Sequence, residues 1–281
     1  MAVPQLTRQR PTIHIRPSKG IRGLDLAEIW RYRGLLYTLV RREIKVRYAQ
    51  SVLGILWALI QPAAFMIVFT ILFGNLVKIQ SDGAPYAVFS FTAMVPWAYF
   101  SSALTTSTNS LVQNINMVTK TYFPRVFLPA SAVMARMVDF GIAFILLFIL
   151  MAWFKIAPTI GILALPWLML IMILSAAGLG MGLSAVAVQF RDVSYAMPFA
   201  VHLLMYAAPV VYPASLIPDR YRLLYGLNPM VGVIEGFRSA LLGTNPMPWD
   251  LIIVGSLSAM VMVACGLVYF RATERIFADV V

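Results

Sequence analysis

IAPTIGILALPWLMLIMILSAAGLGMGLSAVAVQF, residues 156–190, contains no Asp, Glu, Lys or Arg. A helix needs only about 20 such residues to cross the ~30 Å hydrocarbon core of a bilayer. Further runs without charged residues occupy positions 48–77, 83–119, 140–154, 193–218 and 251–270. The composition agrees, because 60% of the chain is apolar and 12% is charged, against about 45–50% and 25% in soluble domains. The sequence therefore predicts an integral membrane protein.

The charge-free runs favour an all-α integral membrane fold over a β-barrel, whose strands would be segments of about ten residues with alternating polarity. Six transmembrane helices are predicted, with approximate limits at residues 52–76, 86–111, 129–154, 160–186, 195–213 and 250–270. We assign residues 34–281 to this six-span domain and residues 1–33 to a cytosolic N-terminal tail. Within the fourth span, the spacing of Gly178 and Gly182 is typical of close helix packing.

The distribution of lysine and arginine predicts the orientation. Eleven of the 22 basic residues precede residue 51, six more would share their side of the membrane, and five would lie on the other side. Because cytosolic segments retain Lys and Arg, both termini are expected in the cytosol. The basic tail is too long for a cleaved signal peptide. The net charge of +11 follows from this topology and from contact with membrane lipids, so we expect no nucleic-acid partner.

Residues suited to catalysis or metal binding are scarce. Cys265 is the one cysteine, and His14 and His202 are far apart, so no metal site is expected. The sequence contains no Gly-Lys-Ser/Thr phosphate loop, so nucleotide energy would come from another subunit. Asp139 is the one acid inside a span, and we expect it to form a local ion pair with Arg136. We therefore predict neither a catalytic residue nor a cofactor in this chain.

An amphipathic helix is predicted at residues 34–49, directly before the first span. Its apolar side chains recur at helical spacing and its basic side chains occupy the other side. The apolar set is Leu36, Leu39, Val40, Ile44 and Tyr48, and the basic set is Arg41, Arg42, Lys45 and Arg47. Such a helix lies along a membrane surface, with its basic side toward lipid phosphates or an acidic partner.

The connection between the second and third spans, QNINMVTKTYFPRVFLP at residues 113–129, is short and rich in bulky side chains. Three aromatic residues are predicted to be exposed there, and they are Tyr122, Phe123 and Phe127. Exposed aromatic rings beside Lys120 and Arg125 indicate insertion among lipid headgroups or contact with a groove on a partner protein. Both readings remain open from the residues alone.

A proline-containing segment, residues 209–249, joins the fifth and sixth spans on the non-cytosolic side. Its apolar part, residues 223–234, is too short to cross a bilayer. The Asn228-Pro229 step predicts two short helices in place of one. Because irregular backbone enters a membrane only where protein buries it or water lines it, we expect re-entrant helices at the mouth of a pathway.

Five segments together resemble the membrane subunit of type-2 ABC exporters, in particular the branch that exports polysaccharides such as O-antigen, capsule and teichoic acid. The segments are RREIKVRYAQSVLGILWALIQP (41–62), VPWAYFSSAL (95–104), TKTYFPRVFLP (119–129), FRDV (190–193) and APVVYPASLIPDRYRLLYGLNPMVGVIEGFRSALLG (208–243). The resemblance covers about residues 34–275 in matching order.

This resemblance implies a homodimeric permease in the bacterial inner membrane, paired with two ATP-binding cassette subunits that bind ATP and Mg²⁺. It implies that the helix before the first span and the loop after the second contact those subunits, through Arg41, Arg42, Glu43, Lys45, Lys120, Tyr122, Phe123 and Arg125. It also implies a periplasmic gate between the last two spans, with Arg220, Tyr221, Asn228, Pro229, Glu235 and Arg238.

The substrate that the resemblance implies is a polysaccharide linked to a lipid diphosphate. Sugars stack on aromatic faces, and seven aromatic residues in or beside the first, second and fifth spans are candidates for a translocation path: Phe65, Phe69, Trp97, Tyr99, Phe100, Tyr206 and Tyr212. Each of them could equally serve ordinary packing or an interfacial belt.

Two alternative functions remain at this point. One is an ABC exporter of a drug or a small lipid, which differs only in its substrate. The other is a membrane-embedded glycosyl or phosphate transferase, which would need clustered acids or a nucleophile with a base. The acids expected on the outer face, Asp82, Asp219, Glu235 and Asp250, are widely separated in the sequence, which disfavours the enzyme.

Overall fold

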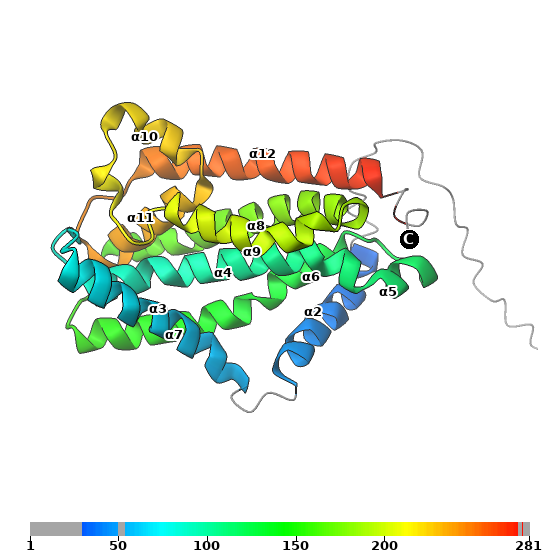
Figure 1. Cartoon of the computed structure of the whole chain (residues 1–281), viewed down its shortest axis with the longest axis horizontal. Helices are drawn as coiled ribbons and strands as arrows, with labels where there is room; N and C mark the ends of the chain where they lie inside the picture. The colour runs from blue at the N-terminus through cyan, green and yellow to red at the C-terminus, as the bar shows by residue number, and fades with distance from the viewer. Residues whose placement is uncertain (1–29, 50–53, 275–276, 278–281) are drawn as a thin grey trace, which may run out of the picture.

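The computed structural model describes residues 30–49, 54–274 and 277, and these residues form a bundle of helices without a strand (Figure 1). Five helical segments in this part are long and apolar enough to cross a membrane: Trp57–Leu76, Tyr86–Gln113, Phe127–Trp153, Ile160–Gln189 and Trp249–Thr273. Each overlaps a span predicted from the sequence. The all-helical fold is thus confirmed, together with five helices of the required length.

Three of these segments change their helical form along their length. α3 (Trp57–Phe69) continues as the π-helix η2 (Thr70–Leu76), and η3 (Ile160–Ala164) leads into α8 (Leu165–Gln189). α6 (Phe127–Ala135) is separated from α7 (Met137–Trp153) at Arg136. By contrast, α4 (Tyr86–Gln113) and α12 (Trp249–Thr273) are continuous.

The predicted span at residues 195–213 is helical over only part of its length. α9 (Asp192–Tyr206) has 15 residues, which corresponds to about 22 Å at the rise of an α-helix. Turns follow from Ala207. The helix is shorter than a typical span, so the count of six remains a prediction.

The short helices gather at the two ends of the bundle. α2 (Arg33–Tyr48) and α5 (Ile115–Lys120) lie at one end, here called the α2 end (Figure 1). α10 (Asp219–Gly226) and the loop between η2 and α4 lie at the opposite end, here called the α10 end (Figure 1). α2 agrees in position with the predicted interface helix, and it packs against α6.

α4 is the central helix of the bundle. Its most apolar 18-residue window is 78% buried inside the protein, whereas the other four long segments are between 11% and 33% buried. α4 also carries many hydroxyl groups, and most of its serine and threonine hydroxyls bond within the helix. Thr105 donates to the carbonyl oxygen of Ser101 and Thr106 to that of Ser102, both at 2.8 Å. Ser107 instead donates to the carbonyl oxygen of Pro129 in α6.

α8 and α12 pack so closely that their backbones touch. A Cβ atom on Gly266 of α12 would lie 2.0 Å from the carbonyl oxygen of Gly178 in α8, and one on Gly178 would lie 2.6 Å from the backbone nitrogen of Val263. Gly182 also faces Gly266, at 3.4 Å. The close packing predicted for Gly178 and Gly182 is therefore confirmed, and Gly266 is the partner residue.

Two helices separated before Pro229 form where the sequence predicted them. α10 ends at Gly226, and α11 (Pro229–Leu242) begins after Asn228, whose side chain accepts a hydrogen bond of 3.1 Å from the Met230 N–H. α11 ends at Gly243, which has the left-handed conformation (φ 67°) that favours glycine. The residues Pro229–Leu241 are all buried, because α4, α8 and α12 surround the helix.

One prediction about the loop at residues 113–129 is wrong. Phe123 is 5% exposed and Phe127 is 1% exposed, whereas both were expected on the surface. They belong to a small apolar core at the α2 end, which also contains Leu39, Phe270 and Phe277. Tyr122 is 66% exposed, as predicted. Two of the three aromatic rings thus stabilise the loop from inside.

Candidate functional site

A cavity of about 170 Å³ lies between α3, α4, α7 and α9, with one residue of α2 at its wall. Its aromatic lining consists of Trp57, Phe65, Trp97, Tyr99 and Phe140. Its polar lining consists of Arg47, Gln61, Ser101, Ser102, Asp139 and His202. The cavity thus combines aromatic walls with one cationic and one anionic side chain, which is a lining that suits an amphipathic ligand.

Asp139 joins α2 to the junction of α6 and α7 at the wall of this cavity. Its carboxylate lies 2.9 Å from the Arg47 guanidinium and 3.5 Å from that of Arg136. Tyr48 donates a hydrogen bond to the same carboxylate, and Arg136 donates one of 2.7 Å to Thr106. The predicted local pair of Arg136 and Asp139 is therefore confirmed, and Arg47 extends it.

Tyr48 stays protonated at physiological pH. Burial of its ring, and then the neighbouring Asp139 carboxylate, raise the pKa of Tyr48 to about 12. The hydroxyl group is therefore a hydrogen-bond donor to Asp139, and the carboxylate has a neutral donor besides its two arginine partners.

The seven aromatic residues predicted for a translocation path do not form one surface. Phe65, Trp97 and Tyr99 line the cavity. Phe69 and Phe100 are buried beside them, each in ring contact with one of the lining residues. Tyr206 is exposed, and its carbonyl oxygen accepts a hydrogen bond of 2.9 Å from the Tyr212 hydroxyl. The structure thus brings together three of the seven at the cavity.

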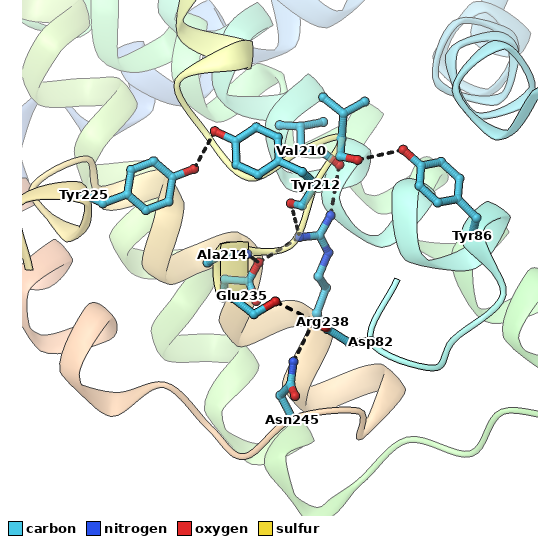
Figure 2. Close-up of polar contacts among 11 residues, drawn as sticks. Asp82, Tyr86, Val210, Tyr212, Ala214, Tyr225, Glu235, Arg238 and Asn245 are labelled. Carbon is cyan, nitrogen blue, oxygen red and sulfur yellow. Dashed lines mark hydrogen bonds and ion pairs between the residues drawn. The ribbon is translucent and has the colours of Figure 1, made fainter. Parts of the chain in front are cut away.

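At the α10 end, Arg238 binds the non-helical backbone that follows α9 (Figure 2). Its guanidinium donates to the carbonyl oxygens of Val210 at 2.9 Å and Tyr212 at 3.2 Å, and to the Glu235 carboxylate at 2.8 Å. Glu235 in turn accepts a hydrogen bond of 3.1 Å from the Ala214 N–H. The Arg238 side chain is 2% exposed, and its charge lies 3.6 Å from the centre of the Phe89 ring.

The remaining residues predicted for a periplasmic gate lie on α10 and at the start of α11. Asn228 caps α11 and Pro229 is its first residue, which is a favourable position for proline. Arg220 lies over the ring of Tyr221, 4.5 Å from its centre, on the exposed side of α10. Tyr225 of α10 pairs with the Tyr212 hydroxyl at 3.0 Å (Figure 2). α10 is thereby attached to the segment that Arg238 holds.

Asp82 connects three loops at the same end. Its carboxylate accepts hydrogen bonds from Asn245 at 2.7 Å and Ser215 at 3.3 Å. Nearby, Arg222 of α10 pairs with Asp250 of α12 at 2.7 Å. The hydrogen bond to Asp250 raises the pKa of the Arg222 guanidinium further above its ordinary value.

The residues predicted to contact an ATP-binding subunit lie on neighbouring segments at the α2 end. Arg42 pairs with Glu43 at 3.1 Å and donates a hydrogen bond of 2.6 Å to the Asn114 side chain, just before α5. Arg125 donates a hydrogen bond to the Glu274 carbonyl oxygen. The side chains of Arg41, Lys45, Lys120 and Tyr122 are exposed. α2 and the loop after α4 therefore form one continuous surface.

The cavity residues that were absent from the predicted sites include three ionisable side chains: Arg47, Asp139 and His202. The sequence showed Arg47 as one of several basic residues and Asp139 as half of a local pair. The contact between them spans 92 positions, so spacing along the chain could not reveal it. One signal was available, namely that Asp139 is an isolated acid inside an apolar span, which often marks a functional position.

Comparison with known proteins gives a consistent result. Residues 34–242 match the family described as "ABC-2 type transporter". The O-antigen export system permease protein RfbA of Myxococcus xanthus is 32% identical over 214 residues, which cover 75% of this chain and 82% of that protein. The polysialic acid transport protein KpsM of Escherichia coli is 23% identical (83% and 91% covered), and the inner membrane transport permease YadH of Escherichia coli K12 is 26% identical (77% and 87% covered).

Proposed function

Since the chain belongs to the ABC-2 type transporter family, we propose that it is the membrane subunit of an ATP-driven exporter of polysaccharide. The substrate is an O-antigen-like glycan linked to a lipid diphosphate, and it moves outward across the bacterial inner membrane. The named export permeases of Myxococcus xanthus and Escherichia coli support a polysaccharide as the cargo. The chain itself performs no chemistry, and the relatives are named as permeases or transport proteins.

The observation that carries this proposal is the aromatic cavity between α3, α4, α7 and α9. Trp57, Phe65, Trp97 and Tyr99 supply flat apolar faces for the C–H surfaces of sugar rings. Gln61, Ser101 and Ser102 supply hydrogen-bonding groups for hydroxyls. These aromatic and neutral polar side chains can bind a sugar ring without a charged contact, which suits a substrate that must move on.

The topology of the proposed subunit has six spans with both termini in the cytosol. α8 ends beside the start of α9, since only Phe190 and Arg191 separate them. α10 and α11 follow α9, and α10 lies at the end of the bundle opposite α2 (Figure 1). The 15 residues of α9, extended by residues 207–213, carry the chain across in this proposal. The excess of basic residues at the α2 end supports a cytosolic location for that end.

Two copies of this chain and two ATP-binding cassette subunits form the working exporter in our proposal. The cassettes bind ATP and Mg²⁺, and they dock on the surface formed by α2 and the loop after α4. Arg42 supports this arrangement, because its bond to Asn114 couples the two docking segments. A push on either segment is thereby transmitted to both α2 and α4.

Substitution at the cavity tests the proposal. Trp97→Ala removes a lining ring, and we expect surface polysaccharide to fall by about tenfold with unchanged membrane abundance. Trp153→Ala is the matched control, since Trp153 is 82% exposed on α7 and outside the cavity. Surface polysaccharide is measured by gel electrophoresis of whole-cell extracts. Equal export by the wild-type and Trp97→Ala proteins would contradict the proposed path.

A drug or small-lipid exporter of the same architecture is the second candidate, and the name of YadH, "transport permease", leaves the substrate open. Deletion of the gene discriminates between the two. Loss of surface polysaccharide supports the first function, whereas intact polysaccharide together with drug-stimulated ATPase activity supports the second. A transferase would instead consume its donor in the absence of the cassettes.

A further inference from the structure

The charged corner of the cavity contains more positive than negative charge. Arg47 and Arg136 share one carboxylate, that of Asp139, at 2.9 Å and 3.5 Å. The side chains of Arg136 and Asp139 are each 13% exposed, and that of Arg47 is 36% exposed. Arg47 and Asp139 line the cavity, whereas Arg136 lies behind Asp139 and outside that lining. The three groups together carry a net charge of +1.

An oxyanion between two guanidinium groups is the arrangement by which proteins hold carboxylates and phosphates alike. Asp139 occupies that position with its own carboxylate. Arg47 can change partners, because its side chain is the more exposed one and it comes from a different helix than Asp139. Arg136 is held separately by its 2.7 Å bond to Thr106. One arginine is thus fixed and the other is exchangeable.

We propose that this corner binds the diphosphate group of a lipid-linked substrate, which replaces the Asp139 carboxylate as the partner of Arg47. The inference rests on the proposed function for the choice of lipid. A diphosphate carries more negative charge than a carboxylate and offers more acceptor oxygens, so Arg47 gains by the exchange. The aromatic rings of Trp57 and Phe65 border the same cavity and receive the adjoining sugar or isoprenoid.

The exchange also releases a connection between helices. Arg47 lies in the last turn of α2, and Asp139 lies in the first turn of α7. When the diphosphate takes Arg47, the ion pair between α2 and α7 is lost. Binding in the cavity thereby frees α2 from α7, and α2 is the helix on which the cassettes are proposed to act.

Binding to the purified full-length chain in nanodiscs of phosphatidylcholine tests the site. The probe is radiolabelled farnesyl diphosphate, and the competitors are farnesol and inorganic diphosphate. Arg47→Ala should weaken binding by about tenfold, the loss expected for one charge-assisted hydrogen bond. Arg33→Ala is the matched control, since it removes the same charge from the same helix at a position outside the cavity. Its affinity should equal that of the wild type.

The distinguishing variant is Asp139→Asn, which removes the competing carboxylate. We expect it to bind farnesyl diphosphate several-fold more tightly, whereas a purely structural carboxylate would give weaker binding when removed. Tyr48→Phe provides a second variant that keeps all charges and deletes one donor to Asp139. It should weaken binding, because the carboxylate then holds Arg47 more strongly. Unchanged or weaker binding by Asp139→Asn overturns the exchange, and so does tighter binding by Tyr48→Phe or unchanged binding by Arg47→Ala.

The competitors identify the source of the phosphate. Farnesol should fail to compete, and inorganic diphosphate should compete weakly. Competition by inorganic diphosphate at the same concentration as farnesyl diphosphate would assign the corner to a free anion and overturn the proposal. Loss of binding in nanodiscs of phosphatidylglycerol would assign it to ordinary membrane lipids and overturn it as well. Because the assay needs neither cassettes nor export, its failure is distinguishable from failure of the proposed function.

Discussion

Arg238 is a charged residue surrounded by protein on every side, and it determines the path of the chain after α9. Its guanidinium binds Val210, Tyr212 and Glu235 (Figure 2). Carbonyl groups of a non-helical segment need partners when they are buried, and the arginine supplies them from α11. A single side chain therefore allows the helix of the fifth predicted span to end early.

We predict that Arg238→Met destabilises the protein by about 3–5 kcal/mol, because it leaves the Glu235 carboxylate buried without its partner. The double variant Glu235→Gln with Arg238→Met should recover part of this loss. Arg222→Met is the control, since its pair with Asp250 is about 40% exposed and should contribute at most about 1 kcal/mol. The measurement is the midpoint of thermal unfolding in detergent. Equal midpoints for Arg222→Met and Arg238→Met would contradict the prediction.

The sequence predicted correctly the exposure of only one of the three aromatic residues in the loop after α4. Tyr122 was placed correctly on the surface, but Phe123 and Phe127 are buried. The loop sequence alone gives no sign of the pocket that receives them, since Leu39, Phe270 and Phe277 come from distant parts of the chain. The contact of Arg47 with Asp139 was hidden for the same reason.

At the scale of elements, the contact of α8 with α12 depends on two glycines. A methyl group on Gly266 would overlap the carbonyl oxygen of Gly178, so the two helices would have to separate. In a membrane this separation costs packing energy that no hydrophobic effect restores. The packing of α8 against α12 should therefore be disturbed even by alanine, the smallest side chain, at either glycine.

We expect Gly266→Ala to destabilise the protein by about 1–3 kcal/mol, the usual effect of overpacking. Gly141→Ala in α7 is the matched control, because no atom lies within 4 Å of its added Cβ, and it should be neutral or stabilising by up to about 1 kcal/mol. The fraction that remains monodisperse after heating, measured by size-exclusion chromatography, reports both. A stable Gly266→Ala variant would mean that α8 and α12 can move apart freely.

The positions of the long helices were largely predictable, because apolar runs of about 20 residues without a charge are typical of transmembrane helices. The end of α9 at Tyr206 was missed because residues 207–213 are as apolar as the helix before them, although Pro209 and Pro213 are signals of a helix end. What the sequence could not show is the tertiary support of this segment, namely the hydrogen bonds that Arg238 supplies to its carbonyl groups. For the candidate site, the sequence named three of the five aromatic lining residues, while Trp57 and Phe140 were not distinguishable from other apolar positions.

At the scale of the whole molecule, the opposite positions of α2 and α10 make the topology testable. In a Cys265→Ser background, Lys45→Cys marks α2 and Arg220→Cys marks α10, and both native side chains are exposed. With six spans, a membrane-impermeant maleimide should label Arg220→Cys in cells with a permeable outer membrane, and label Lys45→Cys only after lysis. Labelling of both positions at the same stage would mean that α9 does not cross the membrane.

The hydrogen bonds that threonine side chains of α4 make to its own backbone have a consequence for biogenesis. α4 is the least apolar of the five long segments, and it leaves the ribosome before α6, α7, α8 and α11, which later pack against it. During that interval its hydroxyl groups face lipid without protein neighbours. Thr105 and Thr106 bond to carbonyls one turn earlier, so these hydroxyl groups have hydrogen-bond partners even in lipid. The nascent helix can therefore remain stable in the bilayer until the helices that enclose it are synthesised.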